Sequence, residues 1–337
     1  MGNSKSKKGL TNRCLSVFLL LGILLYCFPA EAQTKAKVVI RFNELNSATH
    51  PMYRSDVYFA QLVAKKTNGA VEVQNFASSQ LGKGRDAVES CQMGTLEMTQ
   101  TMTANVGTFV SAFDVFSLPF IFRDQEHFYK VIDGPIGQDL LKDLMKVNLF
   151  GLYYYDAGSR SFYNSKRPIR VLEDLKGLKI RVPQSTVMID TINAMGAGAV
   201  PVEYAEVYSS LQQGVIDGAE NAAIAYYHMK HYEVAKYFSL TAHFRTPDIV
   251  MISLRIWQKL PKEYQTAILE SAKETSLYER KLWVSEENQT LEKLKGLGVK
   301  INEVSDVNSF REKVKPVWEK YKTRLPKGLI EKIQATK

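Results

Sequence analysis

The chain has 337 residues, of which 45% are hydrophobic and 23% charged, and its formal net charge is +9. This composition is typical of a folded globular protein and excludes collagen-like, low-complexity and wholly disordered chains, while the length favours two domains. The basic excess lies at the two ends of the chain, because residues 311–337 carry a charge of +6 and residues 33–310 are balanced. An excess confined in this way argues against a nucleic-acid partner.

The first 32 residues are typical of a secretory signal peptide. A basic segment over 5–13 precedes a mostly apolar run over 15–28, and Ala30 and Ala32 then satisfy the small-residue rule for cleavage. We therefore expect an exported protein that is cleaved near Ala32 and begins at Gln33. An uncleaved anchor and N-terminal lipidation are the alternatives.

From residue 37 onward, short apolar runs alternate with longer helical patterns, which is typical of an α/β protein. The first part of this region predicts a βαβαβ unit, with strands over 37–42, 71–76 and 96–101 and helices over 51–67 and 86–93. Asn68-Gly69 and Gly94 are suitable residues for ending the two helices.

The rest of the chain predicts a second sheet with its own helices. The expected segments are strands over 149–155, 178–182 and 248–254, a helix over 185–195, and sheet and helix segments over 206–213, 214–219 and 222–230. The longest helical pattern follows Pro261 and runs to Lys295, where Gly296 and Gly298 end it. At about 1.5 Å per residue this helix would span roughly 50 Å, so we expect it to bridge two lobes.

Motifs of the common enzyme classes are missing from the sequence, including HExxH, G-x-S-x-G, the P-loop and CxxC. The segment from Gly82 to Ala87 fits G-x-G-x-x-A, but the stretch that begins at Phe76 is too long for a tight dinucleotide-binding turn. His228 and His231 are spaced for one helix face but lack further metal-ligating partners, so we expect a half-exposed helix face. Neither a metal nor a cofactor is predicted.

Cys91 is the one cysteine that remains once a signal peptide containing Cys14 and Cys27 is removed. A mature chain of this kind cannot form an internal disulfide. Because the sequence offers no activating partner for the thiol, we expect a small buried side chain rather than a nucleophile.

Arg181 is the binding residue that the pattern itself suggests. It stands near the end of the strand predicted over 178–182, and ligands of open α/β sheets collect at the carboxyl ends of strands. A guanidinium there offers a planar, permanently charged fork that matches a carboxylate. A salt-bridged surface arginine is the equally supported alternative.

Several separated segments, taken in order, resemble one protein family. They are SSQLGKGRDAVESCQMGTLEMT over 78–99, LPFIF over 118–122, GSRSFYNSKRPI over 158–169, GLKIRVP over 177–183, GAGAVPVEYAEVYSSLQQGVIDGAEN over 196–221 and YEVAKYF over 232–238. They are similar to segments of the solute-binding receptors of tripartite ATP-independent periplasmic (TRAP) transporters, of the DctP type. The resemblance covers nearly the whole mature chain.

The resemblance implies a two-lobed α/β binding protein with a ligand cleft between the lobes. The expected boundaries are 33–157 plus 246–285 for lobe I and 158–245 plus 286–337 for lobe II. It further implies a monomer that captures a small organic acid and delivers it to a TRAP membrane permease driven by an ion gradient, without catalysis. The alternatives are an exported enzyme acting on organic acids, with Glu206 or Glu220 as its base, and a receptor that signals rather than transports.

The family's site residues fall on particular positions of this sequence. By the resemblance, Arg181 anchors the ligand carboxylate and Asn221 holds its second oxygen, while Arg160 holds a further acidic or carbonyl group. Tyr204 walls the pocket. The expected ligand-binding set is Arg181, Arg160, Asn221, Tyr204, Glu220 and Met102.

Two first-lobe positions bear on the identity of the ligand. Relatives that bind sialic acid carry acidic side chains at positions that fall on Gly84 and Met102 here. Because those hydroxyl acceptors are absent, we expect a smaller or more apolar acid than a polyhydroxylated sugar acid. A C4-dicarboxylate, a 2-oxo or 2-hydroxy acid and an aromatic carboxylate are the candidates.

Overall fold

The computed structural model describes residues 37–337, which form two β-sheets with helices packed against them. The expected signal peptide lies outside the described residues. The first sheet has the order β2-β1-β3-β10-β4, and its strands are β1 Val38–Asn43, β2 Val71–Phe76, β3 Met98–Met102, β4 Leu149–Tyr155 and β10 Asp248–Ser253. β1 pairs in parallel with β2 and β3, while β10 runs antiparallel between β3 and β4.

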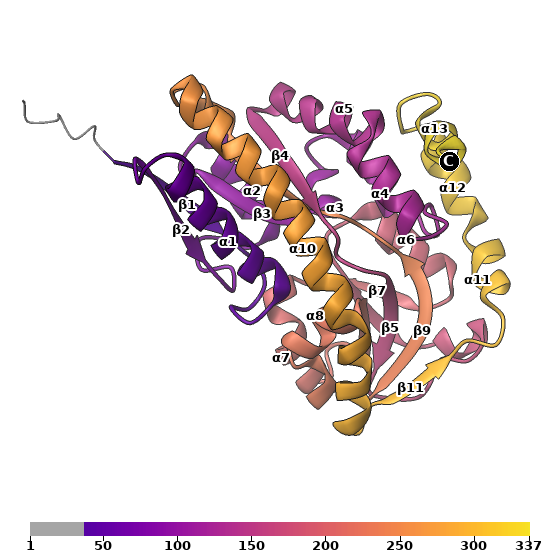
Figure 1. The fold of residues 1–337 in the computed structure, drawn as a ribbon. Coiled ribbons are helices and arrows are strands. Elements are labelled where there is room, and N and C mark those ends of the chain that lie inside the picture. Colours follow the sequence, from indigo (N-terminus) through magenta and orange to yellow (C-terminus); the bar gives the residue numbers. More distant parts are fainter. Residues whose placement is uncertain (1–36) are drawn as a thin grey trace, which may run out of the picture. The chain divides into compact units, whose positions relative to one another are not determined.

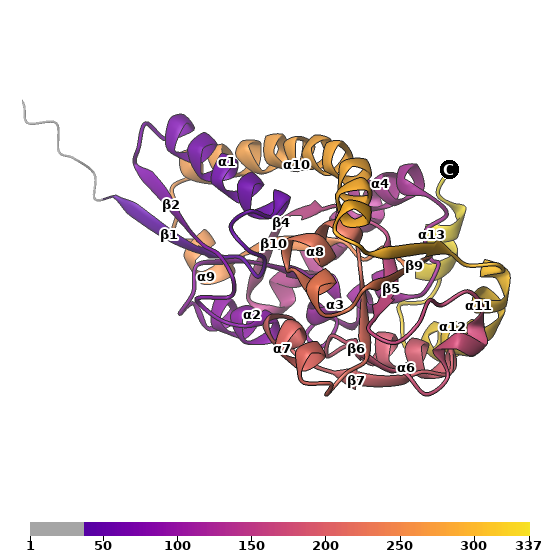
Figure 2. The same ribbon diagram turned by 90° about the horizontal axis from the view of Figure 1, so that it is seen from below.

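Helices cover both faces of the first sheet. Figure 2 shows α1 and the long helix α10 on one side of β1 and β2, and α2 on the other side. The helices of this part of the chain are α1 Pro51–Lys66, α2 Gly84–Met93, α3 Thr103–Val106, α4 Gln125–Asp133, α5 Pro135–Asp143 and α9 Leu254–Trp257. The layered α/β arrangement predicted from the alternating patterns is therefore confirmed.

The second sheet has the order β11-β9-β5-β8-β6-β7. Its strands are β5 Arg160–Asn164, β6 Lys179–Val182, β7 Gly198–Pro201, β8 Gly218–Asn221, β9 Tyr237–Phe244 and β11 Lys300–Glu303. The accompanying helices are α6 Thr186–Ala194, α7 Val207–Gln212 and α8 Ala223–His228. β8 pairs in parallel with β6 and antiparallel with β5, so one end of this sheet combines the carboxyl ends of β6 and β8 with the start of β5.

The helix predicted from Pro261 to Lys295 is confirmed as α10, which spans Lys262–Gly296 and has 35 residues. It packs against strand β4 of the first sheet and helix α1 beside that sheet, and against helix α8, which accompanies the second sheet, as Figure 1 shows. No helix within residues 37–337 combines the length and apolar character that a membrane crossing requires.

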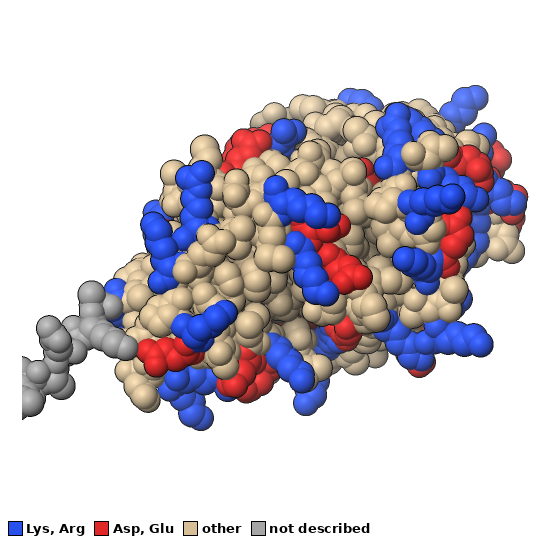
Figure 3. Space-filling model, turned by 90° about the horizontal axis from the view of Figure 1, so that it is seen from above, with Lys and Arg blue, Asp and Glu red and all other residues tan. Residues whose placement is uncertain are grey.

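Three C-terminal helices follow: α11 Val307–Lys313, α12 Lys315–Lys322 and α13 Leu329–Ala335. The OH of Tyr321 donates to Asp190 on α6 at 2.8 Å. His127 on α4 bonds through Nε2 to the carbonyl of Ile333 at 2.7 Å. The C-terminal helices therefore contact elements that accompany each of the two sheets. On the face drawn in Figure 3, basic and acidic side chains are interspersed over the surface.

Two expectations for single residues have clear outcomes. Cys91 lies on the buried face of α2 and is fully enclosed in the apolar core, as predicted, and burial raises the pKa of its thiol. The prediction that His231 lies on a half-exposed helix face is wrong. Helix α8 ends at His228, and His231 is fully buried in the 3-10 turn that follows. Its Nδ1 lies 2.7 Å from the OH of Tyr163, so the ring belongs to a buried aromatic cluster.

Candidate ligand-binding site

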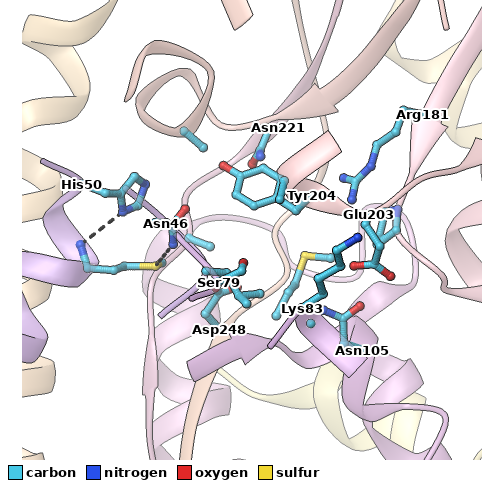
Figure 4. Close-up of a pocket in the computed structure, with 18 of the residues that line it drawn as sticks. Asn46, His50, Ser79, Lys83, Asn105, Arg181, Glu203, Tyr204, Asn221 and Asp248 are labelled. Carbon is cyan, nitrogen blue, oxygen red and sulfur yellow. Dashed lines mark hydrogen bonds between the residues drawn. The ribbon is translucent and has the colours of Figure 1, made fainter. Parts of the chain in front are cut away.

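A pocket lies where the carboxyl ends of strands from both sheets meet. It encloses about 720 Å³ of space between protein atoms, including the part open to solvent, which is typical of small-molecule sites. Figure 4 shows side chains from both sheets pointing into it. Five of the six residues of the expected set line the pocket: Arg181, Arg160, Asn221, Tyr204 and Met102. Glu220 does not line it.

The pairing of the second sheet explains why three of these residues meet. Arg181 lies near the end of β6 opposite Ala219 of β8, and Asn221 ends β8 opposite Ser161 of β5. Arg160 begins β5 at the same end of the sheet. Two arginines and an amide therefore share one sheet end, the place where open α/β sheets bind their ligands.

Arg181 is a buried cation that forms no ion pair with any residue that the structure describes. Its side chain is only 4% exposed, and Nε donates to the carbonyl of Val202 at 2.7 Å. Among residues 37–337 no carboxylate bonds to the guanidinium, whose remaining face is turned to the pocket. Burial lowers the pKa of Arg181, because desolvation disfavours its charged form. A cation held in this way is stabilised by an anion that enters the pocket.

Arg160 is neutralised by the protein itself. Its Nε and Nη2 bond to the two carboxylate oxygens of Glu220 at 2.7 and 2.9 Å, and Nη1 donates to Oδ1 of Asn221 at 2.8 Å. Burial lowers the pKa of Arg160, but the Glu220 carboxylate raises it by more. Both oxygens of Glu220 are occupied and the residue is fully buried behind Arg160. It is placed to hold Arg160 rather than to act as a base on a ligand.

Asn221 and Tyr204 complete a set of donors on this side. Oδ1 of Asn221 accepts from Arg160 and from the backbone N–H of Ala222 at 2.9 Å, which leaves its amide nitrogen to donate into the pocket. Tyr204 has a buried hydroxyl with no partner in the part of the chain that the structure describes. Its ring lies 5.8 Å from the guanidinium of Arg181. Arg181, Asn221 and Tyr204 together suit a carboxylate, which accepts hydrogen bonds and carries negative charge.

The opposite side of the pocket comes from the first sheet and carries acceptors. Asn46 follows β1, and its Nδ2 donates to Oε1 of Glu44 at 2.7 Å. Asn105 follows β3, and its Nδ2 donates to Oγ1 of Thr101 at 2.8 Å. The amide oxygens of Asn46 and Asn105 are therefore left as acceptors at the pocket.

Asp248 adds a carboxylate to the same side. It begins β10 opposite Met102, the last residue of β3, so both stand at one sheet end. Asp248 is 8% exposed, and Nε2 of Gln100 donates to its Oδ2. Burial and, to a smaller extent, the neighbouring Glu44 raise the pKa of Asp248, while Arg160 opposes the rise, and the result is a pKa of about 7. Oδ1 accepts no hydrogen bond from the described residues and is available to a ligand.

Gly84 has no side chain of its own, but it leaves room for a polar side chain from another position. A Cβ at Gly84 would lie 2.6 Å from Nδ2 of Asn105, so the missing side chain leaves room for this amide. Asn105 and Asp248 supply acceptors that the argument from Gly84 and Met102 did not consider. The expectation of a more apolar acid took only Gly84 and Met102 into account.

An ion pair crosses the mouth of the pocket. Nζ of Lys83, just before α2, lies 2.5 Å from a carboxylate oxygen of Glu206, which follows β7. Both side chains are about half exposed, and Figure 4 shows Lys83 extending past Glu203. Within residues 37–337, no group of three or more His, Cys, Asp or Glu side chains is arranged to hold a metal ion.

Comparisons with known proteins agree with this geometry. The model of the DctP family, described as bacterial extracellular solute-binding protein, family 7, matches residues 42–324. A solute-binding protein of Chromohalobacter salexigens is 35% identical over 95% of this chain and 96% of its own length. The C4-dicarboxylate-binding periplasmic protein DctP of Rhodobacter capsulatus is 30% identical over 91% of this chain and 90% of its own.

A solved structure is similar over most of the described chain. It is a TRAP periplasmic solute-binding protein from Roseobacter denitrificans with bound β-D-glucuronate, which superposes with a TM-score of 0.86 at 36% identity. The superposition covers 89% of this chain and all of that one. The chain therefore belongs to the DctP family of bacterial extracellular solute-binding proteins, which are receptors of TRAP transporters and not enzymes.

Proposed function

We propose that this protein is a periplasmic receptor that captures a small organic acid, with sugar acids as the leading class, and delivers it to a TRAP permease. The observation that carries the proposal is Arg181, a buried guanidinium that faces the pocket and has no carboxylate partner in the described part of the chain. The relative from Roseobacter denitrificans holds a sugar acid, which supports this class. Export would follow from the signal peptide that the sequence predicts before Gln33.

Capture requires only hydrogen bonds and charge. Arg181 donates its planar fork to the ligand carboxylate, Asn221 donates its amide N–H to the same group, and Tyr204 adds its hydroxyl. Arg160 holds Asn221 in the required orientation while Glu220 cancels the charge of Arg160. Arg181 is therefore the guanidinium on the donor side that is left to pair with one ligand carboxylate.

Two lobes close over the ligand in this proposal. Lobe I comprises 33–157 plus 246–285 and lobe II comprises 158–245 plus 286–337. The first sheet lies in lobe I and the second sheet in lobe II, and the pocket takes residues from both, which supports the division. Closure excludes water from the pocket and strengthens the charged contacts, and the closed form is what the permease recognises.

Substitution of Arg181 tests the proposal. Arg181→Ala should weaken binding of a sugar acid such as D-glucuronate by about 2–5 kcal/mol, at least roughly 30-fold, because the buried carboxylate loses its partner. Arg181→Lys should recover part of the affinity, since it keeps the charge without the bidentate fork. Isothermal titration calorimetry on protein freed of co-purified solute measures both.

Arg85→Ala is the matched control, because Arg85 stands on the exposed surface of α2 and pairs with Glu89. It should bind the acid like the unmodified protein. Unchanged affinity in Arg181→Ala would show that the carboxylate is anchored elsewhere. If no organic acid bound to the unmodified protein at all, the receptor proposal itself would fail.

A further inference from the structure

We propose that Asp248 and the amide oxygens of Asn46 and Asn105 form an acceptor wall that binds ligand hydroxyls and excludes a second carboxylate. The receptor would then select hydroxylated monocarboxylates over dicarboxylates. This inference rests on the proposed function, because it takes the ligand carboxylate to be anchored at Arg181. It decides between the two ligand classes that the relatives bind.

The hydrogen bonds within the protein decide which atoms the acceptor wall presents. The Nδ2 groups of Asn46 and Asn105 are bonded to Glu44 and Thr101, so the amide oxygens are left for the pocket. Gln100 holds Oδ2 of Asp248 and leaves Oδ1. A ligand hydroxyl is a donor that such oxygens accept, whereas an ionised carboxylate has no hydrogen to donate.

A pair of buried carboxyl groups behind the acceptor wall makes a second ligand carboxylate still less favourable. Glu44 and Asp56 are both fully buried, and they lie close enough to hydrogen-bond to each other. Within the described chain neither carboxyl has a basic partner, since Glu44 accepts from Asn46 and Asp56 accepts from the OH of Tyr155 at 2.8 Å. A ligand carboxylate placed against Asp248 would add negative charge to a region where burial already disfavours it.

The other polar groups on this side of the pocket do not supply a free positive charge. Nδ1 of His50 accepts from the backbone N–H of Met52 at 3.3 Å, and burial holds the pKa of this ring well below its usual range. The ring is therefore neutral and offers at most one N–H. Lys83 is already paired with Glu206 at the mouth. Arg181, on the opposite side, is left as the one cation lining the pocket without a carboxylate partner among residues 37–337.

The two sides of the pocket thus have opposite hydrogen-bonding character. Figure 4 shows Asn46, Ser79 and Asp248 together on one side, and Tyr204 and Asn221 on the other. The donors left free on Arg181, Asn221 and Tyr204 come from the second-sheet side, and the free acceptors of the acceptor wall come from the first-sheet side. Of the other charged groups that line the pocket, Lys83 is paired with Glu206, and Oε1 of Glu203 accepts from Gln184. A molecule with one carboxylate and a hydroxylated chain satisfies both sides at once, and a dicarboxylate of the same length satisfies only one.

The test compares pairs of acids that differ only at the end remote from the anchor, together with one acid that has no hydroxyl groups. D-Gluconate and D-galactonate end in a hydroxymethyl group, while D-glucarate and galactarate carry a carboxylate there; n-hexanoate lacks every hydroxyl. At pH 8, titration calorimetry of the solute-free protein should give at least tenfold tighter binding of an aldonate than of its matching aldarate. Hexanoate should bind at least tenfold more weakly than the aldonate.

Asp248→Asn removes the charge with little change of shape. It should weaken aldonate binding and lower the ratio of aldonate to aldarate affinity at least tenfold. Asp86→Asn, an equal substitution on the exposed surface of α2, should leave the ratio unchanged. Circular dichroism and thermal unfolding establish that both variants are folded.

The possible outcomes separate the two proposals. If the unmodified protein binds aldarates or succinate as tightly as aldonates, the acceptor wall is wrong while the receptor function stands. An unchanged ratio in Asp248→Asn also overturns it, because the discrimination then has another source. If none of these acids binds, the proposed function fails together with the inference.

Discussion

At the scale of single residues, the site depends on which polar atoms the protein leaves free. Glu220 and Arg160 were both expected to contact a ligand, yet they bond mainly to each other, and what they contribute is a correctly oriented Asn221. Arg181 has no carboxylate partner among the described residues and is therefore left to pair with a ligand carboxylate. The two arginines, Arg160 and Arg181, thus differ in role because their hydrogen-bond partners differ.

Gly84 provides a test at this scale. In Gly84→Ala the added methyl group would meet Nδ2 of Asn105 at 2.6 Å, so Asn105 must move and the acceptor wall loses one member. We expect aldonate affinity to fall about tenfold, the value of one good hydrogen bond, with little loss of fold stability. Titration calorimetry and thermal unfolding measure the two effects.

Gly296→Ala serves as the control, because a Cβ there meets nothing within 4 Å. It should leave ligand affinity unaltered. Full affinity in Gly84→Ala would mean that Asn105 is free to rearrange without loss, and its oxygen would then have no part in recognition.

At the scale of elements, the sequence predicted strands well where their side chains are apolar. The bounds of β2 and β4 match the prediction, and α10 starts where predicted and ends one residue later. β5 and β9 were missed, and β8 begins at Gly218 rather than at Gly214. The segments RSFYN and GAEN are fully buried but rich in polar residues, because β5 and β8 carry Arg160, Glu220 and Asn221. Binding residues therefore obscured the periodic signal of their own strands.

The candidate site was predictable to a similar extent. The strand-end rule alone indicated Arg181, whereas Arg160, Asn221 and Tyr204 were found only through the family resemblance. Asn105 and Asp248 were not singled out. Each lies at the edge of an element, beside β3 or at the start of β10, but an Asn or Asp at an element edge is too common to indicate a ligand contact.

Helix α10 carries a buried acid whose effect on stability is testable. Glu279 is fully buried and accepts from the backbone N–H of Asp156 at 3.2 Å, and burial raises its pKa well above the usual value. Since the folded-state pKa exceeds the unfolded one, this group's contribution to stability is fully present below the unfolded pKa and is lost as pH rises.

Glu279→Gln removes this titration while keeping an acceptor for Asp156. The free energy of unfolding of the variant should exceed that of the unmodified protein by more than about 1 kcal/mol at pH 8, with the difference vanishing near pH 4. Urea unfolding at the two pH values measures it. Glu292→Gln, at an exposed position of the same helix, should change stability by less than about 0.5 kcal/mol at both. A pH-independent difference for Glu279→Gln would contradict the argument.

At the scale of the whole described chain, one ligand joins segments that are far apart in the sequence. The pocket takes residues from the loop over 79–84, the turn over 202–206 and the end of β8. Saturating D-gluconate should therefore slow amide hydrogen exchange in segments of both sheets, because the bound acid opposes their opening. Helix α13, which does not line the pocket, should exchange as before. Protection limited to one sheet would contradict binding between the two.

Cys91 is fully enclosed on the buried face of α2, and burial raises the pKa of its thiol, so it reacts poorly with alkylating reagents. A chain that starts at Gln33 contains no other cysteine. A thiol introduced at Ala205, an exposed position on the pocket rim, would then be the sole point of attachment for an environment-sensitive dye. The inert core cysteine thus makes this receptor a convenient scaffold for an optical sensor of its own solute.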